Sequence, residues 1–95
     1  MNVKDIAKTL EERGQKYGSF LCHAKISQDL KAVMQRTPGW VRLAEHQEEA
    51  LEMIVHKIAR ILNGDPHFHD SWHDIAGYAQ LVANSLVEAS EEGKK

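Results

Sequence analysis

The fold is decided by residues 45–83, which read EHQEEALEMIVHKIARILNGDPHFHDSWHDIAGYAQLVA. Apolar residues recur three or four positions apart in both halves of this stretch, as they do in amphipathic helices. Between the halves lies a short segment that begins with Gly64, which suits the left-handed position that follows many helices. The stretch therefore predicts an antiparallel helical hairpin, with one helix over 44–62 and a second from Asp70 or Ser71 onward.

The predicted helix over 44–62 divides into two faces. At 100° per residue its apolar side chains fall on one arc, and its charged side chains form a narrow band on the other side. The apolar arc consists of Ala50, Leu51, Ile54, Val55, Ile58, Ile61 and Leu62. The charged band consists of Glu45, Glu49, Glu52, His56 and Arg60, with Lys57 at its margin.

The last predicted helix is apolar on two sides. A weaker apolar line through Tyr78 and Leu81 lies on the same side as Asp74. The main stripe, with a period of 3.6 residues, consists of Trp72, Ile75, Ala76, Ala79, Val82, Ala83 and Leu86. Because a helix that is apolar on two sides packs on two sides, we expect it to lie centrally or in a subunit interface.

The remaining segments also predict helices and no strand. Val3, Ile6, Ala7 and Leu10 share one face of a first helix, and Ser19 is a suitable cap for a second helix over 20–35. The apolar line of that second helix runs through Cys22, Ile26, Leu30 and Val33. The class is therefore all-α, with a single domain over 1–95 that comprises an N-terminal helix and turn (1–19), a core hairpin (44–87) and a charged tail expected to fray (88–95).

Length and composition limit the function. A chain of 95 residues buries only about 60–65% of its unfolded surface, so we expect a homo-oligomer, a dimer or larger. The net charge of −2 predicts no binding to duplex nucleic acid. Cys22 is the single cysteine, and no apolar run is long enough for a signal peptide or a membrane span. These features predict a cytoplasmic protein with no membrane partner.

The hairpin carries carboxylates that suit a hard cation. Glu49 and Glu52 lie one turn apart on one helix, and Asp70 and Asp74 lie on the other, so the four predict a Mg²⁺ site. In a tight hairpin, however, Asp74 lies level with His56 or Arg60, and Glu52 lies about 10–15 Å farther along. Asp70 and Asp74 then pair with Arg60, Lys57 or His56, or these basic residues meet a phosphate. A merely solvated charged face is the remaining alternative.

Histidines and aromatic residues offer two further candidate sites. His69 and His73 are four residues apart, a spacing found among metal ligands, and His67 is nearby. The alternative is a polar surface loop with three incidental imidazoles. Most aromatic side chains are expected in the core, with Tyr17 and Phe68 as exceptions available for stacking on a base.

Three stretches resemble a known family. They are Glu12-Arg13-Gly-x-x-Tyr17-Gly-x-Phe20, Lys57-Ile-Ala-Arg60-Ile-Leu-Asn-Gly-Asp-Pro and Asp70-Ser-Trp-His-Asp74-Ile-Ala-Gly-Tyr78-Ala. The chain looks like the short phage-encoded proteins of the MazG-like all-α nucleotide pyrophosphohydrolase group. The resemblance covers nearly the whole chain and implies a small four-helix MazG-like bundle that acts in the host cytoplasm.

The resemblance also implies a metal site. Members of the group hydrolyse nucleoside triphosphates with Mg²⁺ and carry Glu-Glu-x-x-Glu followed by Glu-x-x-Asp. Glu48-Glu49-x-x-Glu52 matches the first half, whereas Ser71 stands where the second half has its glutamate before Asp74. The implied metal ligands are Glu49, Glu52, Asp70 and Asp74, with Glu52 as the catalytic residue that activates water.

Three functions remain open. The first is a Mg²⁺-dependent nucleotide pyrophosphohydrolase, and the second is a non-catalytic binder that sequesters a nucleotide, such as a cyclic nucleotide signal of host defence. The third is a structural helical protein that acts only through protein contacts. The residues predicted to bind a nucleotide are Arg13, Tyr17, His56, Lys57, Arg60 and Tyr78.

Overall fold

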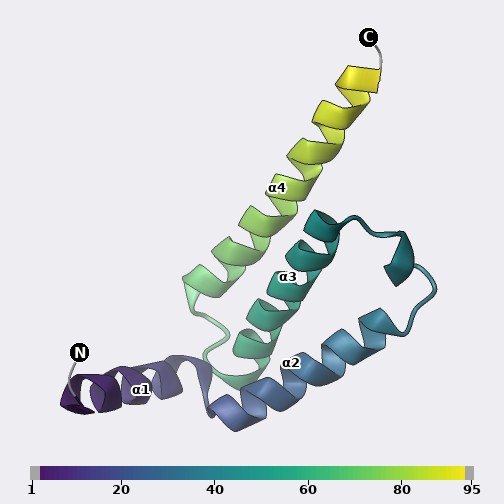
Figure 1. Ribbon diagram of the computed structural model, residues 1–95. Coiled ribbons are helices and arrows are strands. Elements are labelled where there is room, and N and C mark those ends of the chain that lie inside the picture. Colours follow the sequence, from purple (N-terminus) through teal and green to yellow (C-terminus); the bar gives the residue numbers. More distant parts are fainter. Residues whose placement is uncertain (1–2, 94–95) are drawn as a thin grey trace.

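The computed structural model describes residues 3–93 and confirms the all-α class. The elements in chain order are α1 (Val3–Tyr17), α2 (Phe20–Gln35), a 3₁₀ turn η1 (Trp40–Arg42), α3 (Glu45–Asn63) and α4 (His69–Gly93). Helix α3 lies between α2 and α4 and runs antiparallel to both, whereas α1 extends away from the end of the bundle (Figure 1). No helix in this described range is both long and apolar enough to cross a membrane.

Small residues let α3 occupy the central position. Its three buried residues are Ala50, Val55 and Ala59, and Ala59 has no exposed surface at all. Because alanine side chains are short, the two flanking helices can approach the α3 backbone closely. The predicted apolar arc is therefore only partly used, since Leu51 and Leu62 at its edges remain exposed.

Helix α4 packs on α3 through a face that takes Ile75 and Val82 from the predicted main stripe and Tyr78 from the weaker line, whereas Leu81 of that line is exposed. Ser71 is buried, and Ile75, Tyr78 and Val82 follow it on the same face and are half-buried. Most of the predicted main stripe is instead exposed, namely Trp72, Ala76, Ala79, Ala83 and Leu86. The expectation of a central position for α4 is thus wrong within this chain, because α3 occupies the centre. The fold leaves the stripe of α4 without an intramolecular partner in the described residues.

Helix α2 is rotated by about one residue from its predicted orientation. His23 and Ser27 are its buried residues, whereas Cys22 and Val33, which the predicted line contains, are exposed. The polar band of α3 explains this rotation, because α2 meets it with polar partners. The amide of Gln35 donates to a carboxylate oxygen of Glu52 at 3.2 Å, and His23 meets His56.

The C-terminal end of α4 also differs from the prediction. The helix begins at His69, one residue before the predicted start, and continues without a break to Gly93. The tail predicted to fray is therefore helical up to that residue, and positions 94–95 lie outside the described residues. As a result, the last turns of α4 extend beyond the first turn of α3 (Figure 1).

Candidate functional site

The end of α3 is bound to the turn between α1 and α2. The side-chain amide of Asn63 donates to the carbonyl oxygens of Tyr17 at 2.9 Å and of Ser19 at 2.8 Å. The backbone N–H of Asp65 donates to the carbonyl of Lys16 at 2.8 Å. These three hydrogen bonds, together called the clasp below, satisfy two carbonyl groups at the end of α1 and one at the cap of α2, and so fix α1 relative to α2 and α3.

Two glycines make the clasp sterically possible. Gly18 has φ of +77°, a backbone conformation that glycine adopts without strain. A Cβ atom on Gly64 would overlap the carbonyl oxygen of Lys16 and the Cα atom of Tyr17. The prediction that Gly64 is left-handed is wrong, because its φ is −135°. The residue is required by the close crossing of two backbones and not by its own conformation.

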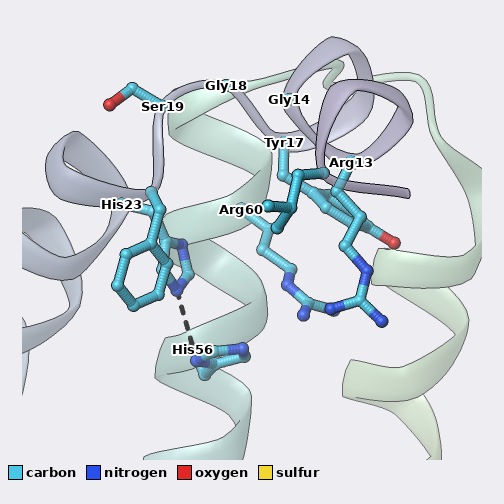
Figure 2. A pocket seen from close by; sticks show the side chains of 10 residues that line it. Arg13, Gly14, Tyr17, Gly18, Ser19, His23, His56 and Arg60 are labelled. Carbon is cyan, nitrogen blue, oxygen red and sulfur yellow. Dashed lines mark hydrogen bonds between the residues drawn. The ribbon is translucent and has the colours of Figure 1, made fainter. Parts of the chain in front are cut away.

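A cavity of about 370 Å³ opens beside the clasp. This volume falls within the usual range for small-molecule sites. It lies between α1, the start of α2 and the last turns of α3 (Figure 2). The lining residues are Leu10, Arg13, Gly14, Tyr17, Gly18, Ser19, Phe20, His23, His56 and Arg60. Four of the six residues predicted to bind a nucleotide are among them, and no carboxylate is.

Two arginines give the cavity its charge. Arg13 comes from α1 and Arg60 from α3, and their side chains extend toward each other across the cavity (Figure 2). The guanidinium carbon of Arg60 lies 4.3 Å from the centre of the Tyr17 ring, a cation–π contact that fixes its position. Within residues 3–93, neither guanidinium has a carboxylate within 4 Å. The two positive charges therefore repel each other, and an anion between them would relieve the repulsion.

Two histidines form the polar floor of the cavity. His23 Nε2 and His56 Nδ1 lie 3.3 Å apart and share a hydrogen bond whose direction depends on the tautomers. His23 is only 6% exposed, and its Nδ1 has no hydrogen-bond partner among the described residues. Burial, reinforced by the nearby Arg60 guanidinium, lowers the pKa of His56 to about 4 and also lowers the pKa of His23. Both imidazoles are thus neutral at pH 7, and each retains a donor and an acceptor.

The cavity contains one of the two aromatic residues predicted for stacking, Tyr17, and a second aromatic residue that was not predicted, Phe20. Phe20 is 76% exposed at the rim of the cavity and stacks on His23, with ring centres 6.4 Å apart. Tyr17 and Phe68 instead pack edge to face against each other, with ring centres at 5.8 Å, and both are half-buried. The sequence did contain a signal for Phe20, because it directly follows the helix cap Ser19 and so begins the outer surface of α2.

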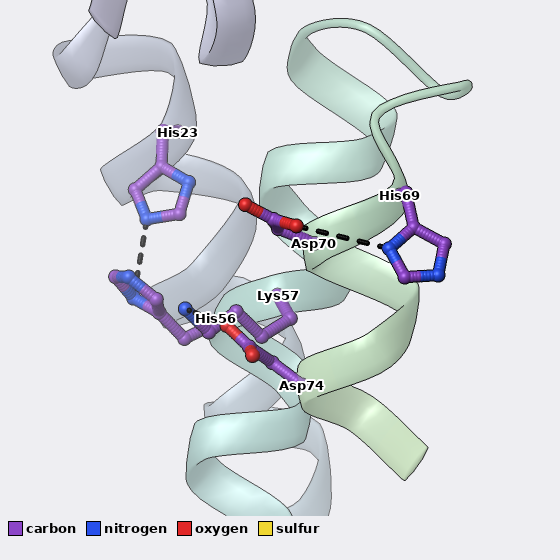
Figure 3. A network of polar contacts seen from close by, with 6 residues as sticks. All are labelled: His23, His56, Lys57, His69, Asp70 and Asp74. Atoms are coloured by element: carbon purple, nitrogen blue, oxygen red, sulfur yellow. Dashed lines mark hydrogen bonds and ion pairs between the residues drawn. The ribbon is translucent and has the colours of Figure 1, made fainter. Parts of the chain in front are cut away.

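Lys57 is removed from the predicted nucleotide site by an ion pair. Its Nζ lies 3.0 Å from a carboxylate oxygen of Asp74, and its side chain is only 12% exposed (Figure 3). The sequence predicted this pairing as one alternative, because Asp74 lies at the same height along the hairpin as this part of α3. The ion pair joins α3 to α4. Asp70 forms no such pair with α3. It lies on the exposed side of α4, 3.7 Å from the imidazole of His69.

The carboxylates of the predicted Mg²⁺ site do not converge within one chain. Glu52 accepts the hydrogen bond from Gln35, and Asp74 is paired with Lys57. The position of Ser71, where the motif has glutamate, faces α3 and is buried, whereas Asp70 points outward and does not replace it. Among the residues that the structure describes, no three His, Cys, Asp or Glu side chains are grouped closely enough to hold a metal ion. The four carboxylates therefore do not fit a Mg²⁺ site in the single chain.

The other predicted positions lie apart from the cavity. Tyr78 and Glu49 line a shallow groove between α3 and α4, near the first turn of α3, whereas Arg60 lies in its last turn. The imidazoles of His69 and His73 stack on each other, with ring centres at 5.6 Å, and His67 is exposed in the loop. The structure thus brings together Arg13, Tyr17, His56 and Arg60 and leaves Lys57 and Tyr78 elsewhere.

Comparisons with known proteins identify the family but not a function. Searches among curated proteins and among solved structures found no match. A family model described as "Domain of unknown function (DUF6378)" matches residues 3–86. This range includes α1, α2 and α3, α4 as far as residue 86, and every residue of the cavity. The chain therefore belongs to the DUF6378 family.

Proposed function

We propose that the protein binds a nucleotide, or a similar phosphate-bearing aromatic molecule, in the cavity between α1, α2 and α3. The observation that carries this proposal is the convergence of Arg13 and Arg60 in a cavity with no lining carboxylate. Guanidinium groups bind phosphate oxygens through two parallel hydrogen bonds, and a phosphate placed between them is attracted by both.

The remaining walls suit the other parts of a nucleotide. The exposed ring of Phe20 offers a face on which a base can stack, at the end of the cavity formed by α2. The His23–His56 hydrogen bond leaves Nε2 of the neutral His56 ring for a polar group of a base or sugar, whereas Nδ1 of His23 is buried. The ligand therefore lies with its phosphate at the arginines and its base toward Phe20.

Binding of this kind requires no resident metal. The cations are supplied by the protein itself, so we expect the complex to form in EDTA and the ligand to be recovered intact. This favours the sequestering binder, and a cyclic nucleotide signal of host defence is one of the ligands to test. Hydrolysis with Mg²⁺ rests on the phage-protein resemblance and on the adjacent Glu49 and Glu52 of α3, neither of which forms an ion pair within the described residues.

The direct test is a ligand panel followed by thermal unfolding. Nucleoside monophosphates, nucleoside triphosphates and cyclic dinucleotides are each added in EDTA and in Mg²⁺, and products are identified by mass spectrometry. We expect at least one ligand to raise the melting temperature equally in both buffers. No shift with any ligand would contradict nucleotide binding, and Mg²⁺-dependent release of pyrophosphate that is lost in Glu52→Gln would favour the enzyme.

Variants separate the parts of the cavity. Arg60→Met keeps an apolar side chain against Tyr17 but removes the charge, so we expect affinity to fall about tenfold or more. Arg42→Met is the matched control, because Arg42 is exposed in η1 outside the cavity. Phe20→Ala should weaken a nucleotide but leave inorganic pyrophosphate unaffected. Equal loss of both anions in Phe20→Ala would contradict the predicted orientation of the ligand.

We also propose that the protein works as a homo-oligomer. Among the described residues, thirteen large apolar side chains are exposed, including Val3 and Leu10 of α1 and Leu86 and Val87 of α4. A single copy therefore leaves large apolar side chains of several helices in water, and association would cover them.

A further inference from the structure

One face of α4 is apolar and uncovered along most of the helix. Trp72 and Leu86, at its two ends, are 54% and 52% exposed. Ala76, Ala79 and Ala83 lie between them on the same face and are also exposed. These five residues form the α4 stripe, which lies beside the face that packs on α3 and contributes no residue to the nucleotide cavity.

All of the α4 stripe except Trp72 lies in a segment without charge. From Ile75 to Val87 the chain has no Asp, Glu, Lys, Arg or His, although such residues are frequent elsewhere in the sequence. Asp74 and Glu88 bound this segment on either side. Charged residues are depleted at the centres of protein interfaces, whereas helix faces exposed to water are rich in them. The composition of this segment is therefore that of a protein contact.

The chain exposes more surface than a compact monomer of its mass, and the excess is as large as one subunit's part of a stable interface. The accessible surface is 7194 Å², whereas a compact monomer of this mass exposes about 5,500 Å². The radius of gyration is 16.7 Å, compared with about 12 Å for a compact chain of this length. The excess of about 1,700 Å², to which the projecting α1 also contributes, is large enough to include the share of one subunit in an obligate interface, roughly 1,000–2,500 Å².

The order of residues along the stripe is self-complementary. Ala79 lies at its centre, and Trp72 and Leu86 each lie seven residues away from it. When two such helices meet antiparallel about a two-fold axis at Ala79, the large Trp72 of one copy faces the partner's Leu86. The small alanines meet in the middle and allow the backbones to approach closely. A two-fold interface pairs the same surface of both copies in this way.

We infer that the α4 stripe is the surface through which two copies of this chain associate, with their α4 helices antiparallel. The projecting end of α4 supports a second copy as the occupant. The hydroxyl of Ser85 contacts the His46 imidazole at 3.3 Å in the first turn of α3, and the turns after it extend beyond the bundle (Figure 1). A short helix that bears Leu86 and Val87 is not stable alone in water, and the partner's α4 covers it.

The first test measures the oligomeric state of the full chain. Sedimentation equilibrium should show a dimer, or a larger assembly of dimers, at micromolar concentration. Ala79→Glu places a charge at the two-fold axis and should weaken association at least a hundredfold. Asn84→Glu is the matched control, because it adds the same charge to the same helix on an exposed face off the stripe. A monomeric wild type, or equal effects of the two variants, would overturn the proposal.

A cross-link keeps the proposal testable where Ala79→Glu fails to fold. In a Cys22→Ser background, Ala79→Cys brings two thiols together at the two-fold axis, and mild oxidation should convert most of the chain into a covalent dimer. Gly77→Cys, off the stripe on the same helix, should not cross-link. Equal cross-linking of both would contradict the antiparallel arrangement. Neither readout requires a nucleotide, so the outcome is independent of whether the cavity binds one.

Discussion

The cavity beside α1 and the stripe on α4 are both open surfaces, but their chemistry is opposite. The cavity is concave, is lined by two arginines and two histidines, and gathers side chains from three helices. The stripe belongs to one helix, is convex, and apart from Trp72 lies in a segment that carries no charge. Positive groups that converge on an enclosed volume favour a small anion, whereas an uncharged helix face favours another helix.

The two surfaces also depend on different parts of the fold. The cavity exists only while the clasp holds α1 against the end of α3. The stripe exists wherever α4 is helical, and α4 is fixed to α3 independently, by its buried face and by the Lys57–Asp74 ion pair. Substitutions at the clasp should therefore alter ligand binding and leave association intact.

Gly64→Ala should have the largest effect. Its Cβ atom meets the backbone of Lys16 and Tyr17, which cannot rotate away, so α1 must separate from α3. We expect a loss of about 3 kcal/mol in the free energy of unfolding and no measurable ligand binding. Urea unfolding and calorimetric titration would measure the two effects. Retention of ligand affinity in this variant would show that the clasp does not build the cavity.

Asn63→Ala should have a smaller effect of the same kind. The variant removes two hydrogen bonds and leaves the carbonyls of Tyr17 and Ser19 without this donor. The expected loss is about 1–3 kcal/mol, together with weaker ligand binding and unchanged association by sedimentation. Asn84→Ala, which loses only an exposed contact with Gln80, is the control and should change stability by less than about 0.5 kcal/mol.

Lower pH should reduce the stability of the fold around the cavity, because His56 lies there, and should leave association through the stripe unchanged. Free histidine takes up a proton near pH 6.5, whereas the folded chain holds His56 neutral until about pH 4, so between these values the unfolded state binds more protons. The groups that oppose protonation are Arg60, His23, Lys57 and Lys31.

Stability should therefore decrease as the pH falls below about 6.5, by roughly 1 kcal/mol per pH unit. Melting temperatures between pH 7 and pH 5 would measure this change. His56→Gln should reduce the slope, and His67→Gln, in the exposed loop, should not. An unchanged slope in His56→Gln would assign the pH dependence to other groups.

Gly77→Ala should have the smallest effect, and in the opposite direction. A Cβ atom at this position meets nothing within 4 Å, and the position lies off both faces of α4 that the fold and the stripe use. Replacing glycine by alanine within a helix should stabilise the chain by about 0.5–1 kcal/mol. Thermal unfolding would show the gain, and ligand binding and association should both stay as they are.

The class, the helix order and most helix boundaries could be predicted from periodicity and caps. The orientation of α2 and α4 could not, because apolar periodicity alone does not show which side meets the partner. His23 and Ser27 face α3 since the charged band of α3 turns toward α2, a pairing between distant segments. The same limit explains the prediction that Lys57 binds a nucleotide, since its partner Asp74 belongs to another helix.

The candidate site was only partly predictable for a related reason. Arg13 and Tyr17 were indicated by the resemblance, and His56 and Arg60 by their band on α3, but nothing in their spacing shows that they share one cavity. Phe20 was missed because an aromatic residue beside an apolar line is usually buried. The close approach of Gly64 to the backbone of Lys16 and Tyr17 joins segments that are distant in the sequence. The sequence therefore predicts a helix end at Gly64 but not this contact.

The attachment of α1 has a consequence for exchange with solvent. None of its residues is buried, and it is held to the bundle near its last turn. Its amide protons should therefore exchange through local opening, at a lower free energy than global unfolding. Because opening removes one wall of the cavity, a bound ligand must suppress it, and the apparent affinity is reduced by the fraction of chains that are open. Slower exchange in α1 alone would report occupancy of the cavity.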